Sequence, residues 1–457
     1  MKRIFAVVFV LIVLAAFTPL GCFADNVYDD LGGELFYHSG NLGPGVYRIL
    51  QGEYPLDIGY EVIQLTGQVI FDLNGMTYQT LDYNDSYTIK CAENSDCSLE
   101  IKDGLGGGKF LMDGHIEVDH LTISGGEVRA NNKSLSIKAH NITIDGGKVT
   151  ADSITTPNEN GDTINISGGT VTGRKQIGCD NNNGNCKINI NINGGAVVKD
   201  TKLISGGTIE IAGNAELTTE IGGILANGSV TIDGGKVSAA ESGINAVNGG
   251  SITILDGNVI NSGIISNGNI NIEGGTVTAT NYGSTLNSLY AQGDITISGG
   301  TVTATATGYQ EALAIQALGS VIINGGKVTA TGGSSGHGIN AEGSITISGG
   351  TVEMASGGEY GIYAGSGGIT IKGDNTQVTA KATGPSDKAG IYSSGGIDIQ
   401  GGMVNATGGI SGIQANGDTT ISGGTVTATG VLYGIRANGS ITIKDGGTVK
   451  EIGRAHV

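Results

Sequence analysis

The stretch GINAEGSITISGGTVEM, residues Gly338–Met354, decides the fold, because close copies of it recur along most of the chain after residue 120. Its first segment alternates: Ile339 and Ala341 share one side of an extended chain, and Asn340 lies on the other. The same alternation returns in SITIS and in GTVEM. Turns that contain glycine separate the three segments, and glycine adopts positive φ without steric cost. Each copy therefore predicts three short strands.

The copies repeat with a period of roughly 20–29 residues, mostly near 23, which is typical of a solenoid. About five inward aliphatic side chains per copy, at roughly 2 kcal/mol each, do not offset about 1–2 kcal/mol of backbone entropy for every ordered residue. Copies must therefore stack and bury one another. The sequence predicts an all-β fold, a right-handed single-stranded parallel β-helix with three short strands per rung. The first strand returns as GILA at Gly223, GINA at Gly243, GIIS at Gly263, AIQA at Ala314, GIYA at Gly361, GIYS at Gly390, GIQA at Gly412 and GIRA at Gly434.

The composition agrees with a narrow aliphatic core. The chain has 457 residues, with 83 glycines, 5 prolines and no tryptophan, and 38% of its residues are hydrophobic. The formal net charge of −18 repels phosphate backbones and anionic membranes. We therefore expect no nucleic-acid partner.

The N-terminal segment has the features of an export signal. Residues 1–24 combine Lys2 and Arg3 with an apolar run and with small residues at Cys22 and Ala24, the pattern of a secretory signal peptide. Acylation of Cys22 is an alternative reading. No later segment is long and apolar enough to span a bilayer, so we expect a secreted or cell-surface protein whose mature chain has no membrane span.

Four further cysteines form two local pairs. Cys91 and Cys97 flank the loop AENSD, and Cys179 and Cys186 flank DNNNGN. Three connectivities are possible, and local disulfides suit an exported chain. A metal site is disfavoured, because the spacing is too wide and no histidine accompanies the pairs.

The domain organisation follows from where the repeats begin and end. Residues 25–118 are less repetitive and predict an N-terminal β cap with the first rungs, and residues 119–451 predict the parallel β-helix repeats. Residues 452–457, IGRAHV, break the pattern. They match the translation of a sequencing adapter, and we expect a non-native tail there.

Catalytic and metal-binding patterns are weak. Gly336-His337-Gly338 matches one element of polygalacturonases, but paired aspartates and an Arg-x-Lys are missing, so we expect His337 to be a turn residue and the protein not to be an enzyme. We expect no cofactor. Calcium binding stays open because three acidic residues precede Gly-Gly turns, where capping of the turn backbone is the simpler role. They are Asp145, Asp233 and Glu273.

The residues that the first strand turns outward form the candidate ligand-binding face. From Tyr290 onward this column holds amides, tyrosines and an arginine, which suit saccharides: rings for the apolar faces of sugars and amides for hydroxyl pairs. Loops beside the strand add further tyrosines, including Tyr282 and Tyr309. Stabilisation of stacked strands is an equally good explanation of the same residues. The candidate ligand-binding residues are Tyr290, Gln316, Asn340, Tyr360, Tyr363, Tyr392, Gln414, Tyr433 and Arg436.

Three motifs carry a resemblance to a known family. DLNG at Asp72, SLEIKDGLGGG at Ser98 and copies such as ISGGTVTATG at Ile421 resemble bacterial surface β-helix proteins of a carbohydrate-binding family, including a pectin-binding type. The resemblance covers most of the chain after the signal and implies a polysaccharide or a host cell-surface glycan as partner. Adhesins and autotransporter passengers share these structural motifs. No catalytic residue or calcium ligand of the family matches a position in this chain.

Two functions follow as hypotheses. The first is a secreted, non-catalytic β-helix that binds a uronan or a neutral polysaccharide along the face formed by the first strands. The second is an adhesin or a structural surface stalk whose rungs only set its length.

Overall fold

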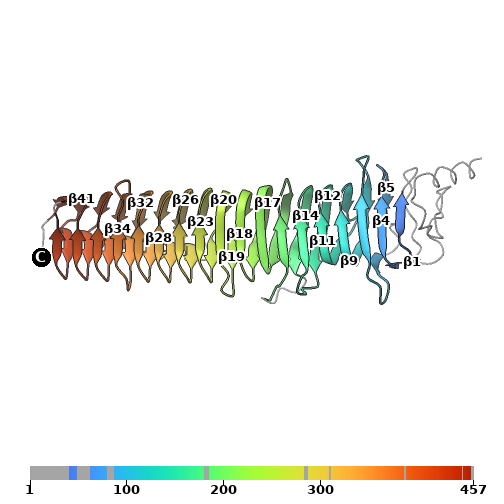
Figure 1. Ribbon diagram of the computed structural model, residues 1–457, viewed down its shortest axis with the longest axis horizontal. Coiled ribbons are helices and arrows are strands. Elements are labelled where there is room, and N and C mark those ends of the chain that lie inside the picture. Colours follow the sequence, from blue (N-terminus) through green and yellow to red (C-terminus); the bar gives the residue numbers. More distant parts are fainter. Residues whose placement is uncertain are drawn as a thin grey trace, which may run out of the picture.

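The computed structural model describes residues 41–48, 62–79, 87–179, 185–281, 287–307, 310–384, 388–444 and 446–453. The predicted signal peptide, the predicted tail after Gly453, Tyr282 and Tyr309 lie outside these residues. The described residues contain no helix of the length and apolarity needed to cross a membrane. They form one 44-stranded sheet that winds into an elongated solenoid (Figure 1).

The first strands form rungs with several short connections. They are β1 (Asn41–Leu42), β2 (Gly45–Arg48), β3 (Val62–Leu65), β4 (Gln68–Asp72), β5 (Thr77–Gln79), β6 (Tyr87–Cys91), β7 (Ser98–Lys102), β8 (Lys109–Leu111), β9 (Gly114–Ile123) and β10 (Glu127–Arg129).

In the next rungs many strands are long and bend around the corners of the solenoid, and β17 contributes to all three faces. They are β11 (Leu135–Ile144), β12 (Lys148–Thr156), β13 (Thr163–Ile166), β14 (Thr170–Cys179), β15 (Asn189–Ile192), β16 (Val197–Gly206), β17 (Thr208–Ala226), β18 (Val230–Ala239), β19 (Ile244–Ala246) and β20 (Ile252–Asn261).

The remaining rungs are regular, with three short strands each. They are β21 (Ile264–Ser266), β22 (Ile270–Ile272), β23 (Thr276–Asn281), β24 (Asn287–Ala291), β25 (Ile295–Ile297), β26 (Thr301–Ala306), β27 (Leu313–Ala317), β28 (Val321–Ile323), β29 (Lys327–Thr331), β30 (His337–Ala341), β31 (Ile345–Ile347), β32 (Thr351–Gly357), β33 (Tyr360–Ala364), β34 (Ile369–Ile371), β35 (Gln377–Ala382), β36 (Ala389–Ser393), β37 (Ile397–Ile399), β38 (Met403–Thr407), β39 (Ser411–Ala415), β40 (Thr419–Ile421), β41 (Gly424–Thr429), β42 (Tyr433–Ala437), β43 (Ile441–Ile443) and β44 (Gly447–Ile452).

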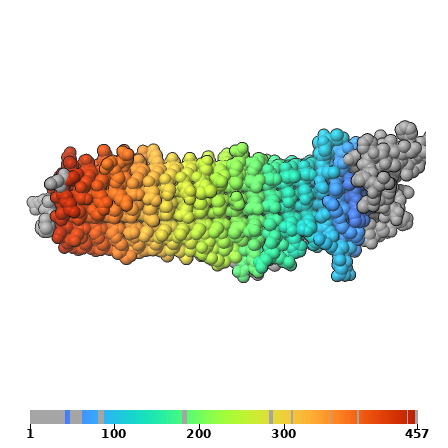
Figure 2. Space-filling view, in the orientation of Figure 1, coloured from blue at the N-terminus to red at the C-terminus, as the bar shows by residue number. Residues whose placement is uncertain are grey.

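Each strand pairs in parallel with its counterpart in the next rung, so the solenoid has three faces. We call the face that contains β30, β33 and β36 face A, the face that contains β31, β34 and β37 face B, and the face that contains β32, β35 and β38 face C. The prediction of a parallel β-solenoid with three strands per rung is confirmed. Figure 2 shows the resulting rod.

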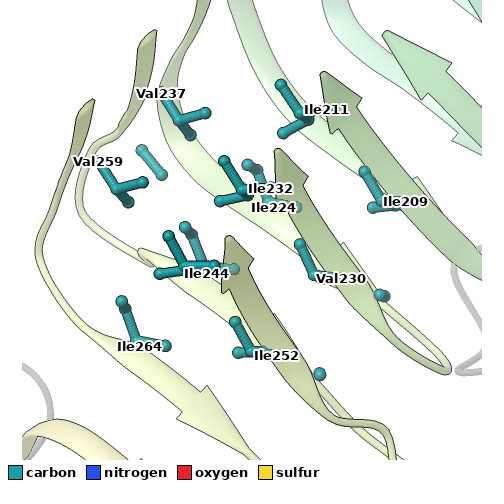
Figure 3. Close-up of a cluster of buried hydrophobic side chains, with 14 of the residues drawn as sticks. Ile209, Ile211, Ile224, Val230, Ile232, Val237, Ile244, Ile252, Val259 and Ile264 are labelled. Carbon is teal, nitrogen blue, oxygen red and sulfur yellow. The ribbon is translucent and has the colours of Figure 1, made fainter. Parts of the chain in front are cut away.

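The core is a stack of aliphatic side chains, one layer per rung. Ile224, Ile244 and Ile264 follow one another up face A, and Figure 3 shows them pointing inward against aliphatic residues of the other two faces. All three are fully buried. Because side chains alternate along a strand, the residue that follows each of these isoleucines is turned outward.

The Gly-Gly turns leave no room for a side chain. Gly350 has φ of 73°, and a Cβ there would collide with the carbonyl oxygen of Gly326 in the previous rung. The backbone of one rung rests directly on the next, which explains why the second glycine recurs in the repeat.

Both predicted cysteine pairs are disulfides. The Cα atoms of Cys91 and Cys97 lie 5.4 Å apart, and those of Cys179 and Cys186 lie 5.9 Å apart. Each bridge closes a loop that leads from a strand on face A to the following strand on face B. The bridges therefore fix the two loops at the same corner of the solenoid.

Candidate functional site

Face A carries the predicted outward column in continuous register. Gln316 pairs with Asn340, Asn340 with Tyr363, and Tyr363 with Tyr392. The predicted stacking at one-rung intervals is confirmed. The full column is Leu225, Asn245, Ile265, Tyr290, Gln316, Asn340, Tyr363, Tyr392, Gln414 and Arg436.

One member of the column is buried. The expectation that Asn340 presents its amide to solvent is wrong, because only 2% of its surface is exposed. Nδ1 of His337 donates a hydrogen bond to Oδ1 of Asn340 across 3.0 Å, and the imidazole covers the amide. Asn340 therefore orients His337.

Three rings form what we call the aromatic stack: His337, Tyr363 and Tyr392. The ring centroids of His337 and Tyr363 lie 4.8 Å apart, and those of Tyr363 and Tyr392 lie 5.3 Å apart with their planes only 8° from parallel. These distances approach the spacing of paired strands, about 4.8 Å, so the stack follows from the rungs themselves. Because Tyr363 has a ring on each side, the expectation that its faces are open to sugars is wrong.

Tyr360 lies across the aromatic stack. Its ring centroid is 5.3 Å from that of Tyr363 and 4.8 Å from that of Tyr392. Nζ of Lys388 lies 5.4 Å from the Tyr360 centroid, at cation–π distance. Burial, together with the neighbouring tyrosines and Glu359, raises the pKa of Tyr360 to about 12. The phenol is therefore protonated at neutral pH and can both donate and accept hydrogen bonds.

An ion-pair network borders the same rings. Oε1 of Glu359 forms an ion pair with Nζ of Lys388 at 2.8 Å, and Oε2 of Glu359 lies 3.6 Å from Nε2 of His337. Burial alone would raise the pKa of Glu359, but Lys388 and His337 outweigh it and lower that pKa. Burial also lowers the pKa of His337, and the bonds to Asn340 and Glu359 do not compensate. At neutral pH the imidazole is neutral and the carboxylate is ionised.

The expectation that His337 is a turn residue is wrong. It is the first residue of β30, and it pairs with Tyr360 of β33. A sequence signal for this position existed, since His337 and Tyr360 both stand two residues before the buried isoleucine of their strand.

These side chains line a shallow groove of about 370 Å³ on face A. The groove brings together five of the predicted binding residues: Gln316, Asn340, Tyr360, Tyr363 and Tyr392. Leu313, His337, Glu342 and Glu359 complete it, and sequence reasoning missed their part in it.

The other four predicted binding residues lie outside the groove. Toward the N-terminal end, Tyr290 pairs in register with Gln316. The side chain of Gln316 accepts a 2.6 Å hydrogen bond from the side chain of Asn287. Toward the C-terminal end, the guanidinium carbon of Arg436 lies 5.7 Å from the ring centroid of Tyr433. The predicted residues outside the groove are Tyr290, Gln414, Tyr433 and Arg436.

The acidic residues considered for calcium are exposed, one to a turn, and the described residues hold no cluster of three carboxylates that could share an ion. One group of metal-ligand type comprises Cys91, Cys97 and Asp119. Its sulfur atoms are joined in the disulfide, and Asp119 accepts a 2.9 Å hydrogen bond from the Cys97 amide. This carboxylate therefore anchors the loop. Calcium binding stays a prediction.

The comparisons with known proteins concern the repeats. Five segments match a family model described as a beta helix repeat: residues 270–284, 295–314, 321–339, 345–368 and 420–439. Searches of curated proteins and of solved structures returned no match. The matched segments include β33 and parts of β27 and β30, but not β36, so only part of the groove lies in segments that are similar to beta helix repeats.

Proposed function

We propose that this protein is a secreted or cell-surface, non-catalytic polysaccharide-binding β-helix. The observation that carries the proposal is the groove on face A, where tyrosine hydroxyls, the Gln316 amide and the Glu342 carboxylate gather over consecutive rungs. An open groove along a solenoid suits a polymer that lies lengthwise. The two disulfides support an oxidising compartment.

Binding in this groove uses ring edges and hydroxyl groups. The faces of Tyr363 are covered by its neighbours in the aromatic stack, which leaves the phenol groups to meet sugar hydroxyls. Glu342 adds negative charge to the groove, whereas Glu359 is ion-paired with Lys388, and the whole chain carries a formal net charge of −18. Like charges repel, so a neutral glycan is favoured over a uronan.

The electrostatics of the groove support a non-catalytic role. Glycoside hydrolysis needs one carboxylic acid with a raised pKa that protonates the leaving group. The pKa of Glu359 is lowered instead, because the residue is ion-paired with Lys388. Glu359 is therefore a poor general acid, and no covalent step is part of the proposal.

A glycan array tests this function. The double variant Tyr363→Ala/Tyr392→Ala is compared with Met403→Ala, which removes an exposed side chain on face C. We expect the wild type and Met403→Ala to bind the same neutral glycans and the double variant to lose at least tenfold in affinity. Unchanged binding by the double variant would refute the groove as the site, and release of reducing ends from a bound glycan would refute the non-catalytic role.

A structural surface stalk or adhesin is the second candidate, and the aromatic stack itself favours it. Rings that cover one another from rung to rung bury apolar surface without offering it to a ligand. If this is the main role, the array shows no specific glycan, and the double variant changes stability alone.

A further inference from the structure

A second hollow, on face B, is separate from the groove. It measures about 540 Å³ and extends from the rung of Gly368 to that of Lys444. It shares no lining residue with the groove on face A. The sequence patterns did not point to it.

A ladder of polar residues marks the corner where face B begins. The residue just before each face B strand accepts, through its carbonyl oxygen, a hydrogen bond from the first amide of the previous face B strand. Ile295 donates to Ser320 in this way across 2.9 Å, and Val321 donates to Ser344 across 3.0 Å. The positions in this column are Ser251, Asn269, Asp294, Ser320, Ser344, Gly368, Gly396, Asp418 and Ser440.

Side chains of this column also bond from rung to rung. Oδ1 of Asn269 accepts a 2.9 Å hydrogen bond from the Asp294 amide, and Oδ1 of Asp294 accepts one of 2.7 Å from the Ser320 amide. Oδ1 of Asp418 likewise accepts a 2.7 Å bond from the Ser440 amide. At these three rungs the polar side chain satisfies the backbone amide of the next rung.

The ladder is interrupted at two consecutive rungs, and the interruption coincides with the hollow. Gly368 and Gly396 line the hollow and supply no side chain. Among the described residues, the amides of Gly396 and Asp418 accordingly have no hydrogen-bond acceptor. By the register of the ladder, both amides face the positions where the missing side chains would lie.

The hollow is lined by both hydrogen-bond donors and hydrogen-bond acceptors. Asp398 accepts a 2.6 Å hydrogen bond from Nε2 of Gln400, and Asp418, Thr420 and Lys444 lie on the neighbouring rungs. An anion would meet two carboxylates, and the described residues of the hollow include no group of three acidic, histidine or cysteine side chains close enough to share a metal ion. A hydroxyl group both donates and accepts, so it matches this mixture.

We propose that the hollow on face B is a second saccharide subsite, which binds neutral sugar hydroxyls through the free amides of Gly396 and Asp418 and through the side chains of Asp398 and Gln400. The inference rests on the proposed function in that the ligand is a glycan, but it assigns a separate surface. Because Gly368 and Gly396 have no side chains, the space at their positions stays open. The backbone amides of Gly396 and Asp418 are then available to donate hydrogen bonds to a ligand.

The matched variant is Gly396→Ser. Serine stands at this register in Ser320, Ser344 and Ser440, so the variant fills the hollow with a residue that the solenoid already accommodates. A Cβ at Gly396 would approach the carbonyl oxygen of Asp418 to 3.0 Å, which a small shift relieves. Gly104→Ser is the control, because a Cβ there meets nothing within 4 Å. Thermal unfolding of both variants checks that the fold is retained.

The probes are cellohexaose, xylohexaose, mannohexaose and hexagalacturonate, measured by calorimetry with the full chain. We expect at least one neutral hexasaccharide to bind, Gly396→Ser to raise its Kd at least tenfold, and Gly104→Ser to leave the Kd unchanged. Binding of hexagalacturonate in preference to the neutral sugars overturns the ligand class.

The two proposals fail in different ways. If Gly396→Ser binds like the wild type while Tyr363→Ala/Tyr392→Ala does not, the subsite on face B is wrong and the groove on face A stands. If only Gly396→Ser loses binding, the subsite stands and the groove is wrong. If no hexasaccharide binds the wild type, both are overturned.

Discussion

The solenoid stacks aromatic rings in two places, once inside and once outside. Tyr78 and Phe110, near the N-terminal end, have centroids 4.5 Å apart and planes 6° from parallel, and both rings are buried. Tyr363 and Tyr392 also stack with nearly parallel planes, but they are only partly buried, on the outside of face A. Register alone therefore produces the stack, and the position in the pleat decides whether the stacked rings lie in the core or on the outer surface.

The inner pair gives the largest expected effect. Phe110 is fully buried and contacts both Tyr78 and Phe71. Phe110→Ala leaves a cavity, and we expect it to destabilise the N-terminal rungs by about 3–5 kcal/mol. Urea denaturation followed by circular dichroism measures the change. A loss below about 1 kcal/mol would show that the surrounding rungs collapse into the space.

Removing a disulfide sharpens the contrast between the two regions, since both described bridges lie in the N-terminal half. Closing a loop of this length accounts for about 2 kcal/mol of stabilisation. We expect Cys91→Ala/Cys97→Ala to lower the stability of the N-terminal rungs by that amount and to leave the stability of the rungs around Tyr363 unchanged. Hydrogen exchange resolved by region makes the measurement. Equal loss of protection in both halves would mean that the rod unfolds as one unit.

The outer stack gives a smaller effect on stability. Each stacked aromatic pair contributes about 1 kcal/mol beyond its buried area. Tyr392→Ala removes the pairs with Tyr363 and Tyr360, so we expect a loss of about 1–2 kcal/mol by urea denaturation, with Tyr392→Phe as the control that keeps the ring. A loss as large as that of Phe110→Ala would place the outer stack among the core elements.

The smallest effect concerns two histidines whose pH dependences have opposite signs. Burial lowers the pKa of His337, so its contribution to stability is complete above about pH 6.5 and is lost as the pH falls through the folded pKa. The hydrogen bond that His140 donates to the Asp162 carboxylate raises the pKa of His140, so the contribution of His140 to stability is complete below about pH 6.5 and is lost as the pH rises through the folded pKa.

Urea midpoints between pH 5 and pH 8 separate the two histidines. Relative to His337→Phe, the wild type should lose stability toward acid pH. Relative to His140→Gln, it should lose stability toward alkaline pH. The same slope in both comparisons would contradict the assignment.

The sequence predicts the repeating part of this protein well, for a physical reason. Side chains alternate strictly along a strand, so reading every second residue of the GIxA copies placed Tyr363 above Asn340 and below Tyr392. The disulfide between Cys91 and Cys97 could be predicted because only a short loop separates the two residues.

The details that the sequence did not predict depend on contacts across rungs. Whether Asn340 is open or covered depends on where the ring of His337 turns, and that follows from a hydrogen bond between side chains. The closed faces of Tyr363 follow from ring orientation. The hollow at Gly396 arises because two residues in the column before the face B strands are glycines. The sequence shows these glycines, but their effect follows only once the register of that column is known.

The near-identity of the rungs has a consequence for the gene. Residues 295–305 and 419–429 read ITISGGTVTAT and TTISGGTVTAT, so their coding sequences are natural partners for unequal recombination. A single crossover between them would remove whole rungs and leave β24 followed by a face B strand in the correct order. The shortened rod would keep its register but lack the aromatic stack and most of the hollow, so a single genetic step can change the side chains presented on two faces while the scaffold stays intact.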